Sequence, residues 1–138
     1  MAIDALKVGL RHQQTIRVTE RLTVPAMSDA FAGFDDMPPV LATGYLVAFT
    51  EWTCLDALRP YLETGQRTVG TRVDLTHVAA TPVGMQVTAE VELIAVEGKK
   101  LRFRVLCRDE VDVIGEGHHD RAVIDFDRFM ARVATKRQ

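Results

Sequence analysis

Residues 44–62 read Gly44-Tyr45-Leu46-Val47-Ala48-Phe49-Thr50-Glu51-Trp52-Thr53-Cys54-Leu55-Asp56-Ala57-Leu58-Arg59-Pro60-Tyr61-Leu62, and this stretch decides the fold. Its apolar and small residues recur at spacings of three and four, which predicts one α-helix. Few of its residues are charged, so we expect other parts of the chain to wrap this helix on most sides. Thr43 is a candidate N-cap and Gly65 a candidate terminator. Pro60 removes one helical hydrogen bond, which predicts a kinked or separate last turn.

Downstream of this helix the pattern changes to alternation with a period of two. From Met85 to Val96, apolar residues alternate with polar ones, as in a half-buried strand. Glu97-Gly98-Lys99 predicts a hairpin turn, and a second alternating strand follows it through Cys107. We expect three further elements, namely strands at Thr68 to Ala80 and at Val111 to Phe126, and a short closing helix at Asp127 to Ala134.

Upstream of the helix the chain is less regular. We expect a strand at Gln14 to Val24, and then a loop rich in Gly, Pro and Asp from Pro25 to Pro39. A loop of this length in a compact domain is more often a functional lid than a plain connection.

The order of strand, loop, apolar helix and four consecutive strands in a meander predicts an α+β hotdog fold. In that fold one antiparallel sheet wraps around a single long helix, and residues 1–138 would form one domain. A closed lipid-binding barrel is the competing architecture, but such barrels lack a helix that is apolar nearly all round. A second subunit commonly covers the free edges of a hotdog sheet, so we expect a homodimer.

The composition is that of an ordinary globular protein, with 47% hydrophobic and 26% charged residues and a formal net charge of −2. This balance gives no electrostatic reason to expect nucleic acid or an anionic membrane as a partner. No apolar run approaches the roughly 18 residues that span a bilayer, and Met1 to Gln14 lacks the apolar core of a secretion signal. We therefore expect a cytoplasmic protein.

Several kinds of chemistry find no support in the sequence. Cys54 and Cys107 form no CxxC pair, so we expect buried apolar cysteines rather than a disulfide framework or a zinc site. The single serine, Ser28, stands outside any GxSxG motif, which argues against a serine nucleophile on a strand-to-helix turn. His118 and His119 would face opposite sides of a strand, so we expect no metal site.

Three polar residues are candidate reacting groups. Glu51 interrupts the apolar helix; it is either a paired, buried carboxylate or lies on a narrow strip that faces solvent. His77 has the chemistry of a general base at neutral pH, although an ordinary surface or core histidine is the plain alternative. Thr43 is either a simple cap or part of a helix N-terminus that holds an oxyanion or a phosphate.

Helix geometry limits how these groups meet. Thr43 and Glu51 would lie about 12 Å apart along the axis of one straight helix, too far for direct contact. Either Thr43 folds back in the preceding loop, or two subunits share the site, or the substrate spans both residues. A basic hairpin is a further candidate feature, either as a solvated face or as an attraction for the phosphates of coenzyme A; it comprises Lys99, Lys100, Arg102 and Arg104.

Six segments, in one order along the chain, carry a family resemblance. They are Ala42 to Val47 leading into Glu51 to Cys54, then Pro60 to Glu63, Val69 to Thr71, Thr76 to Pro82, Val96 to Gly98, and His119 to Ile124. Over roughly residues 21–133 the chain resembles the fluoroacetyl-CoA thioesterase family. The resemblance implies a hotdog dimer whose catalytic threonine, glutamate and histidine match Thr43, Glu51 and His77. It also implies that Gly70 and Arg121 lie near the acyl group.

The same resemblance bears on the substrate. Where the fluoroacetate-specific enzyme has an aromatic residue just before the helix, this chain has Met37, with Phe31 and Phe34 upstream. We expect Met37 and Phe34 to contact the acyl group, and fluoroacetyl selectivity does not carry over from the resemblance.

The expected activity is hydrolysis of a small or short-chain acyl-CoA to the free acid and CoA, with no cofactor beyond the coenzyme A of the substrate. His77 would be the general base, Glu51 would orient it or attack as a nucleophile, and Thr43 would hold the thioester oxygen. One alternative is a non-catalytic domain that binds acyl-CoA or another small ligand on the same fold. Another is an enoyl-CoA hydratase, which would require a histidine on the helix, and this helix has none.

Overall fold

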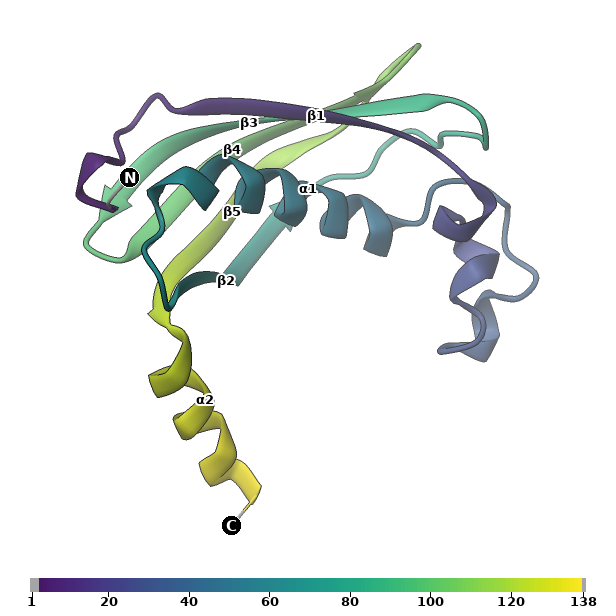
Figure 1. Ribbon diagram of the computed structural model, residues 1–138. Coiled ribbons are helices and arrows are strands. Elements are labelled where there is room, and N and C mark those ends of the chain that lie inside the picture. The colour runs from purple at the N-terminus through teal and green to yellow at the C-terminus, as the bar shows by residue number, and fades with distance from the viewer. Residues whose placement is uncertain (1–2, 138) are drawn as a thin grey trace.

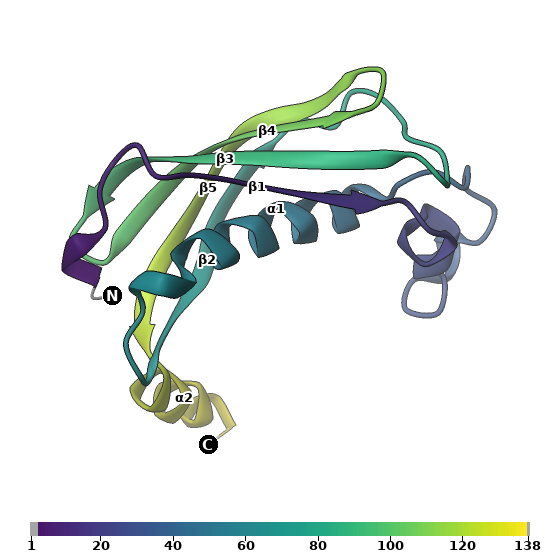
Figure 2. The same ribbon diagram turned by 45° about the horizontal axis from the view of Figure 1, so that its top comes forward.

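The structure is a computed structural model that describes residues 3–137, and within this range five strands form one antiparallel sheet. The sheet curves over one long helix, α1 (Thr43–Leu58) (Figures 1 and 2). The strands are β1 (Arg11–Arg17), β2 (Gln66–Leu75), β3 (Gln86–Glu97), β4 (Lys100–Asp109) and β5 (Val113–Asp125). A second helix, α2 (Phe126–Ala134), leaves the end of β5 and projects away from the sheet (Figure 1). This is the predicted α+β arrangement.

The core lies between the concave face of the sheet and α1. Alternation along β3 and β4 sends every second side chain inward, and the predicted strand at Met85 to Val96 is confirmed as β3. The inward residues meet the apolar stripe of α1, and both cysteines are buried in this core as predicted. The largest fully buried apolar side chains are Phe103, Leu41, Leu46, Leu58, Leu93, Leu101 and Ile114.

The ends of α1 follow the sequence only in part. The helix ends at Leu58 and a separate 3-10 turn, η5 (Arg59–Tyr61), contains Pro60, which confirms the predicted break. Gly65 has a φ of +86° but lies in the turn before β2, beyond the helix end. The prediction of Thr43 as N-cap is wrong. The extended residue that caps the helix is Ala42, whose carbonyl accepts from the N–H of Leu46, so Thr43 is already helical.

The segment before α1 differs from the predicted strand at Gln14 to Val24. β1 starts and ends earlier, because its partner β3 begins at Gln86, opposite Arg17, and offers no further residues for pairing. The described chain then forms short 3-10 helices, η2 (Glu20–Leu22), η3 (Val24–Met27) and η4 (Ala32–Phe34), in the region predicted as an irregular lid. Two further 3-10 turns are η1 (Ile3–Ala5) and η6 (Thr135–Arg137).

The position of β2 also differs from the prediction. β3, β4 and β5 form a meander. The hairpin turn predicted at Glu97-Gly98-Lys99 is confirmed, and it consists of Gly98 and Lys99, since Glu97 still belongs to β3. β2, however, pairs with β5 at the far edge in the order β1-β3-β4-β5-β2. The prediction of a four-strand meander is therefore wrong. Residues 76–85 are too long for a tight hairpin, and they carry the chain from β2 at one edge past β5 and β4 to β3, next to the opposite edge strand β1. β2 ends at Leu75 rather than Ala80, so His77 lies just beyond the strand.

Two apolar surfaces remain uncovered in a single chain. The sheet wraps most of α1, but Gly44, Ala48 and Trp52 stay exposed along one side, with Trp52 48% exposed. α2 buries none of its residues, and Phe126, Phe129, Met130 and Val133 form an exposed apolar stripe at helical spacing. No helix within residues 3–137 is long and apolar enough to cross a membrane.

Candidate functional site

Thr43 and His77 form a pair at the start of α1. The hydroxyl Oγ1 of Thr43 lies 2.7 Å from Nδ1 of His77, which stands in the segment after β2. A glycine in β5 allows that segment to come close, since a Cβ at Gly115 would lie 2.1 Å from the carbonyl oxygen of Thr76. Burial lowers the pKa of His77 below its usual value, which favours the neutral imidazole. Its other nitrogen, Nε2, is buried without a hydrogen-bond partner among residues 3–137.

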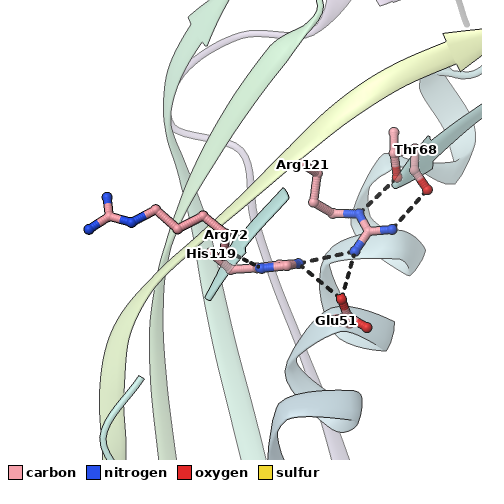
Figure 3. Close-up of polar contacts among 5 residues, drawn as sticks. All are labelled: Glu51, Thr68, Arg72, His119 and Arg121. Carbon is pink, nitrogen blue, oxygen red and sulfur yellow. Dashed lines mark hydrogen bonds and ion pairs between the residues drawn. The ribbon is translucent and has the colours of Figure 1, made fainter. Parts of the chain in front are cut away.

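Glu51 lies two turns further along α1, beside a buried cation. Its Oε1 is 3.6 Å from Nη1 of Arg121 and 3.9 Å from Nε2 of His119 (Figure 3). The glutamate side chain is 40% exposed, whereas those of Arg121 and His119 are 5% and 1% exposed. Solvent or a substrate can therefore reach the Glu51 carboxylate from one side. On the other side, the fixed positive charge of Arg121 stabilises it.

Hydrogen bonds hold the guanidinium of Arg121 in one orientation. Nε donates to the hydroxyl of Thr68 at 2.9 Å and Nη2 donates to the main-chain oxygen of Thr68 at 2.8 Å. Nη1 donates to Nε2 of His119 at 3.0 Å, as Figure 3 shows. Burial lowers the pKa of Arg121, and the nearby Glu51 opposes this shift. Three of the five N–H groups of a guanidinium are thereby used, which leaves two for other partners.

Gly70 gives Glu51 the space that it occupies. A Cβ at position 70 would lie 2.6 Å from Oε1 of Glu51, closer than any van der Waals contact allows. Gly70 stands at an irregularity of β2, where the pairing with β5 shifts between Gly70 and Arg72. Such a bulge redirects the strand locally. The predicted residues Gly70 and Arg121 therefore both lie against Glu51.

The predicted catalytic residues thus fall into two groups within one chain. Thr43 contacts His77, while Glu51 contacts Arg121 and His119 rather than His77. Because Thr43 belongs to α1, the possibility that it folds back in the preceding loop is excluded. The expected axial separation of about 12 Å between Thr43 and Glu51 follows from the helix geometry.

The two predicted acyl contacts of the lid belong to the segment that precedes α1. Met37 is 45% exposed. Phe34 belongs to η4 and packs edge-on against Phe31, with 5.9 Å between their ring centroids. The contact of Met37 and Phe34 with an acyl group stays a prediction.

The basic hairpin is partly neutralised. Arg102 donates two hydrogen bonds to Asp120, at 2.8 and 2.9 Å, and Arg104 pairs with Glu92 at 3.0 Å. These contacts indicate that Arg102 and Arg104 belong to a solvated face of the sheet, the first of the two interpretations given for the hairpin. A groove of about 610 Å³ nevertheless runs between this hairpin and β2, and its lining includes Arg72, Lys100 and Arg102.

Two members of the Glu51 group were not predicted from the sequence as site residues, namely Thr68 and His119. A signal for His119 does exist, because His119 and Arg121 occupy inward positions of an alternating strand, where apolar side chains are the rule. As predicted, His118 faces the other way and is exposed. In the described range no group of three or more His, Cys, Asp or Glu side chains is arranged to hold a metal ion.

Comparisons with known proteins identify the family. The family model described as fluoroacetyl-CoA-specific thioesterase matches residues 18–127, most of the chain. The chain belongs to the fluoroacetyl-CoA-specific thioesterase family. A member of this family, the fluoroacetyl-CoA thioesterase of Streptantibioticus cattleyicolor, is 43% identical over 133 residues, which cover 96% of both chains. This chain is accordingly a thioesterase.

Solved structures agree with this assignment to the fluoroacetyl-CoA-specific thioesterase family. A structure of the fluoroacetyl-CoA thioesterase superposes with a TM-score of 0.93 at 43% identity, covering 96% of this chain and 98% of the other. A hot-dog-like protein from Thermanaerovibrio acidaminovorans superposes with a TM-score of 0.81 at 20% identity, covering 96% and 94% of the two chains. The predicted hotdog fold is confirmed.

Proposed function

We propose that the protein hydrolyses the thioester of a small or short-chain acyl-CoA to the free acid and CoA. The observation that carries this proposal is the accessible Glu51 carboxylate, 3.6 Å from a buried Arg121 whose guanidinium is already oriented. An oriented cation in a poorly solvated site stabilises the negative charge that develops on a thioester oxygen or on a leaving carboxylate. The 43% identity to an enzyme named for hydrolysis of an acyl-CoA supports the same reaction.

Glu51 would act on the substrate directly. Within one chain its carboxylate faces Arg121 and not His77, so an orienting role toward His77 has no contact to support it. As a nucleophile, Glu51 would attack the thioester carbon, and the C–S bond would break to give an enzyme-bound anhydride and the CoA thiolate, which takes up a proton. A water molecule would then add to the Cδ carbon of Glu51 in the anhydride and give its proton to a base. The acid would leave as its carboxylate, and Glu51 would be restored with the oxygen of that water.

His77 would be the base that removes the proton from that water. Its lowered pKa keeps the imidazole neutral near pH 7, and Thr43 fixes the ring through Nδ1. If Nδ1–H donates to the hydroxyl of Thr43, the lone pair of Nε2 is free to accept a proton. A buried nitrogen without a partner is costly to keep, which supports a role in the reaction rather than in stability.

The active form would be a homodimer. The outer edge of β2 is free in a single chain, with residues 70–74 exposed, including Val73 at 46%. Free strand edges and exposed apolar side chains such as Trp52 are surfaces that a second copy covers. The separation of Thr43 and His77 from Glu51 supports a site built from two subunits. The groove beside Arg72 and Lys100 would receive the phosphates of CoA.

An acyl-CoA panel tests the proposal. Release of free thiol from acetyl-, fluoroacetyl-, propionyl- and longer acyl-CoAs is measured for the wild type, for Glu51→Gln and for His77→Ala. We expect fast hydrolysis of a small acyl group by the wild type only, with losses of about 10²- to 10⁴-fold in each variant. Equal, slow release by all three proteins would instead indicate a non-catalytic binding domain. The role of Glu51 is tested by a single turnover in ¹⁸O-water, after which a nucleophile carries ¹⁸O in its carboxylate.

A further inference from the structure

His119 connects two parts of the site that are distant in sequence. Its Nδ1 lies 2.8 Å from the main-chain oxygen of Arg72 in β2, and its Nε2 lies 3.0 Å from Nη1 of Arg121 in β5 (Figure 3). The side chain is 1% exposed, so both contacts are shielded from water. Histidine is an unusual choice for such an inward strand position, and both of its ring nitrogens are used.

The two partners of His119 select one form of the ring. The carbonyl of Arg72 only accepts a hydrogen bond, so Nδ1 must carry a proton. The guanidinium of Arg121 only donates, so Nε2 must offer its lone pair. A neutral imidazole protonated at Nδ1 satisfies both contacts, whereas the charged ring would place an N–H against Nη1 of Arg121. Burial and the charge of Arg121 lower the pKa of His119, which agrees with this neutral form.

Each contact bears on Glu51. The acceptor Nε2 uses one N–H of Nη1, and Nη1 is the same nitrogen that lies 3.6 Å from Oε1 of Glu51. The donor Nδ1 binds Arg72, the residue at which the pairing of β2 with β5 resumes after the irregularity. Gly70 stands on the other side of that irregularity, where a Cβ would lie 2.6 Å from Glu51.

We propose that His119 is a positioning residue for hydrolysis: as the neutral, Nδ1-protonated ring it fixes the guanidinium of Arg121 and the bulge of β2, and so sets the surroundings of Glu51. The inference rests on the proposed function, because Glu51 and Arg121, which His119 would position, are the groups assigned to the reaction. It adds a residue whose role is separate from those of Thr43, Glu51 and His77, because His119 would act through Arg121 and Gly70.

Two substitutions separate the two contacts. His119→Asn keeps a donor near the position of Nδ1 but has no acceptor that reaches Arg121, and His119→Gln keeps an acceptor near Nε2 but loses the donor to Arg72. The full-length protein is assayed for kcat, KM and thermal midpoint. Since a displacement of about 1 Å in a reacting group costs about 100-fold, we expect His119→Asn to lower kcat by about that factor with KM changed less than about threefold. We expect His119→Gln to retain at least a tenth of the wild-type kcat.

The exposed neighbour provides the control. His118→Gln changes the adjacent residue on the opposite face of β5 and should leave kcat and KM at wild-type values. A merely structural role predicts that Asn and Gln at position 119 lower kcat equally and in step with the thermal midpoint. That result, or a wild-type kcat in both variants, would overturn the proposal.

A spectroscopic measurement keeps this test separate from that of the proposed function. The ¹⁵N shifts of the His119 ring in the wild type report its tautomer without any substrate. We expect a protonated Nδ1 and an unprotonated Nε2 at pH 7. We also expect the Nε–H resonance of Arg121 to be broader in His119→Asn than in the wild type, because the guanidinium is less well fixed in the variant. A ring protonated at Nε2 would overturn the proposal even if hydrolysis is found. If the wild type hydrolyses no acyl-CoA while the tautomer is as expected, the proposed function fails and the structural link of His119 stands.

Discussion

Gly70 lies directly against the carboxylate of Glu51, and a Cβ at position 70 would be 2.6 Å from Oε1. Glu51 is a flexible, partly exposed side chain that can move away, but the Cβ would also lie 3.2 Å from Cε1 of the buried His119, so we expect Gly70→Ala to fold with a slightly lowered thermal midpoint. The displaced carboxylate should nevertheless lower kcat by about 100-fold. The measurement is kcat beside thermal unfolding. Gly33→Ala is the matched control, because no heavy atom lies within 4 Å of a Cβ there. Wild-type activity in Gly70→Ala would show that the position of Glu51 is not critical.

Thr43 should matter through its hydroxyl alone. Thr43→Ala removes the partner at 2.7 Å from Nδ1 of His77, and the ring loses the contact that fixes it. We expect kcat to fall by about 10- to 100-fold, a fraction of what a general base contributes. Thr43→Ser keeps a hydroxyl and should stay within about threefold of the wild type. Both variants are compared by steady-state kinetics, and equal loss in the two would point to the methyl group instead.

If two subunits share each active site, two inactive variants should restore activity when they form a mixed dimer. In a mixed dimer of Glu51→Ala and His77→Ala chains, one site would combine the intact Glu51 of one subunit with the intact His77 of the other. Random exchange of equal amounts makes half the dimers mixed, so activity should recover to about a quarter of the wild type. Thiol release is measured before and after subunit exchange by dilution from mild denaturant. No recovery, with mixed dimers present by mass spectrometry, would place both residues in one subunit's site.

Stability should fall as the pH drops below the usual histidine range. The pKa values of His77 and His119 are lowered from 6.5 in the folded protein, so below about pH 6.5 the unfolded chain binds more protons than the folded one. The contribution of the two histidines to the free energy of unfolding is therefore fully present above pH 6.5 and is lost on acidification. The free energy of unfolding should fall by up to about 1.4 kcal/mol per pH unit for each proton taken up. The charged groups that act on His119 are Arg121, Glu51 and Asp120.

Urea unfolding between pH 8 and pH 5 measures this dependence. This range excludes Asp109 and Asp120, whose lowered pKa values act only below about pH 4. We expect His119→Gln to flatten the decline. An identical pH dependence in the wild type and His119→Gln would show that His119 titrates alike in the folded and unfolded protein.

Much of the fold could be predicted from local patterns. The spacing in residues 44–62 predicts α1, Pro60 predicts the separate last turn, and the alternation around Gly98 predicts the β3–β4 hairpin. These features succeed because each depends on residues that are close in sequence. The irregular region before α1 is also predicted. The sequence pattern predicts its strand too late in the chain, because pairing with β3, and not propensity, decides where β1 ends.

The sequence by itself also determined which residue types were anomalous, with Glu51 as a charge in an apolar helix. Only the tertiary structure decided what that charge meets. β2 crosses to the far edge of the sheet and pairs with β5, which brings Thr68, Gly70 and Arg72 beside His119 and Arg121. The same crossing takes His77 to Thr43 and away from Glu51. The physical reason is that strand order depends on contacts between distant segments, and the inward side chains of two strands become neighbours only when those strands pair.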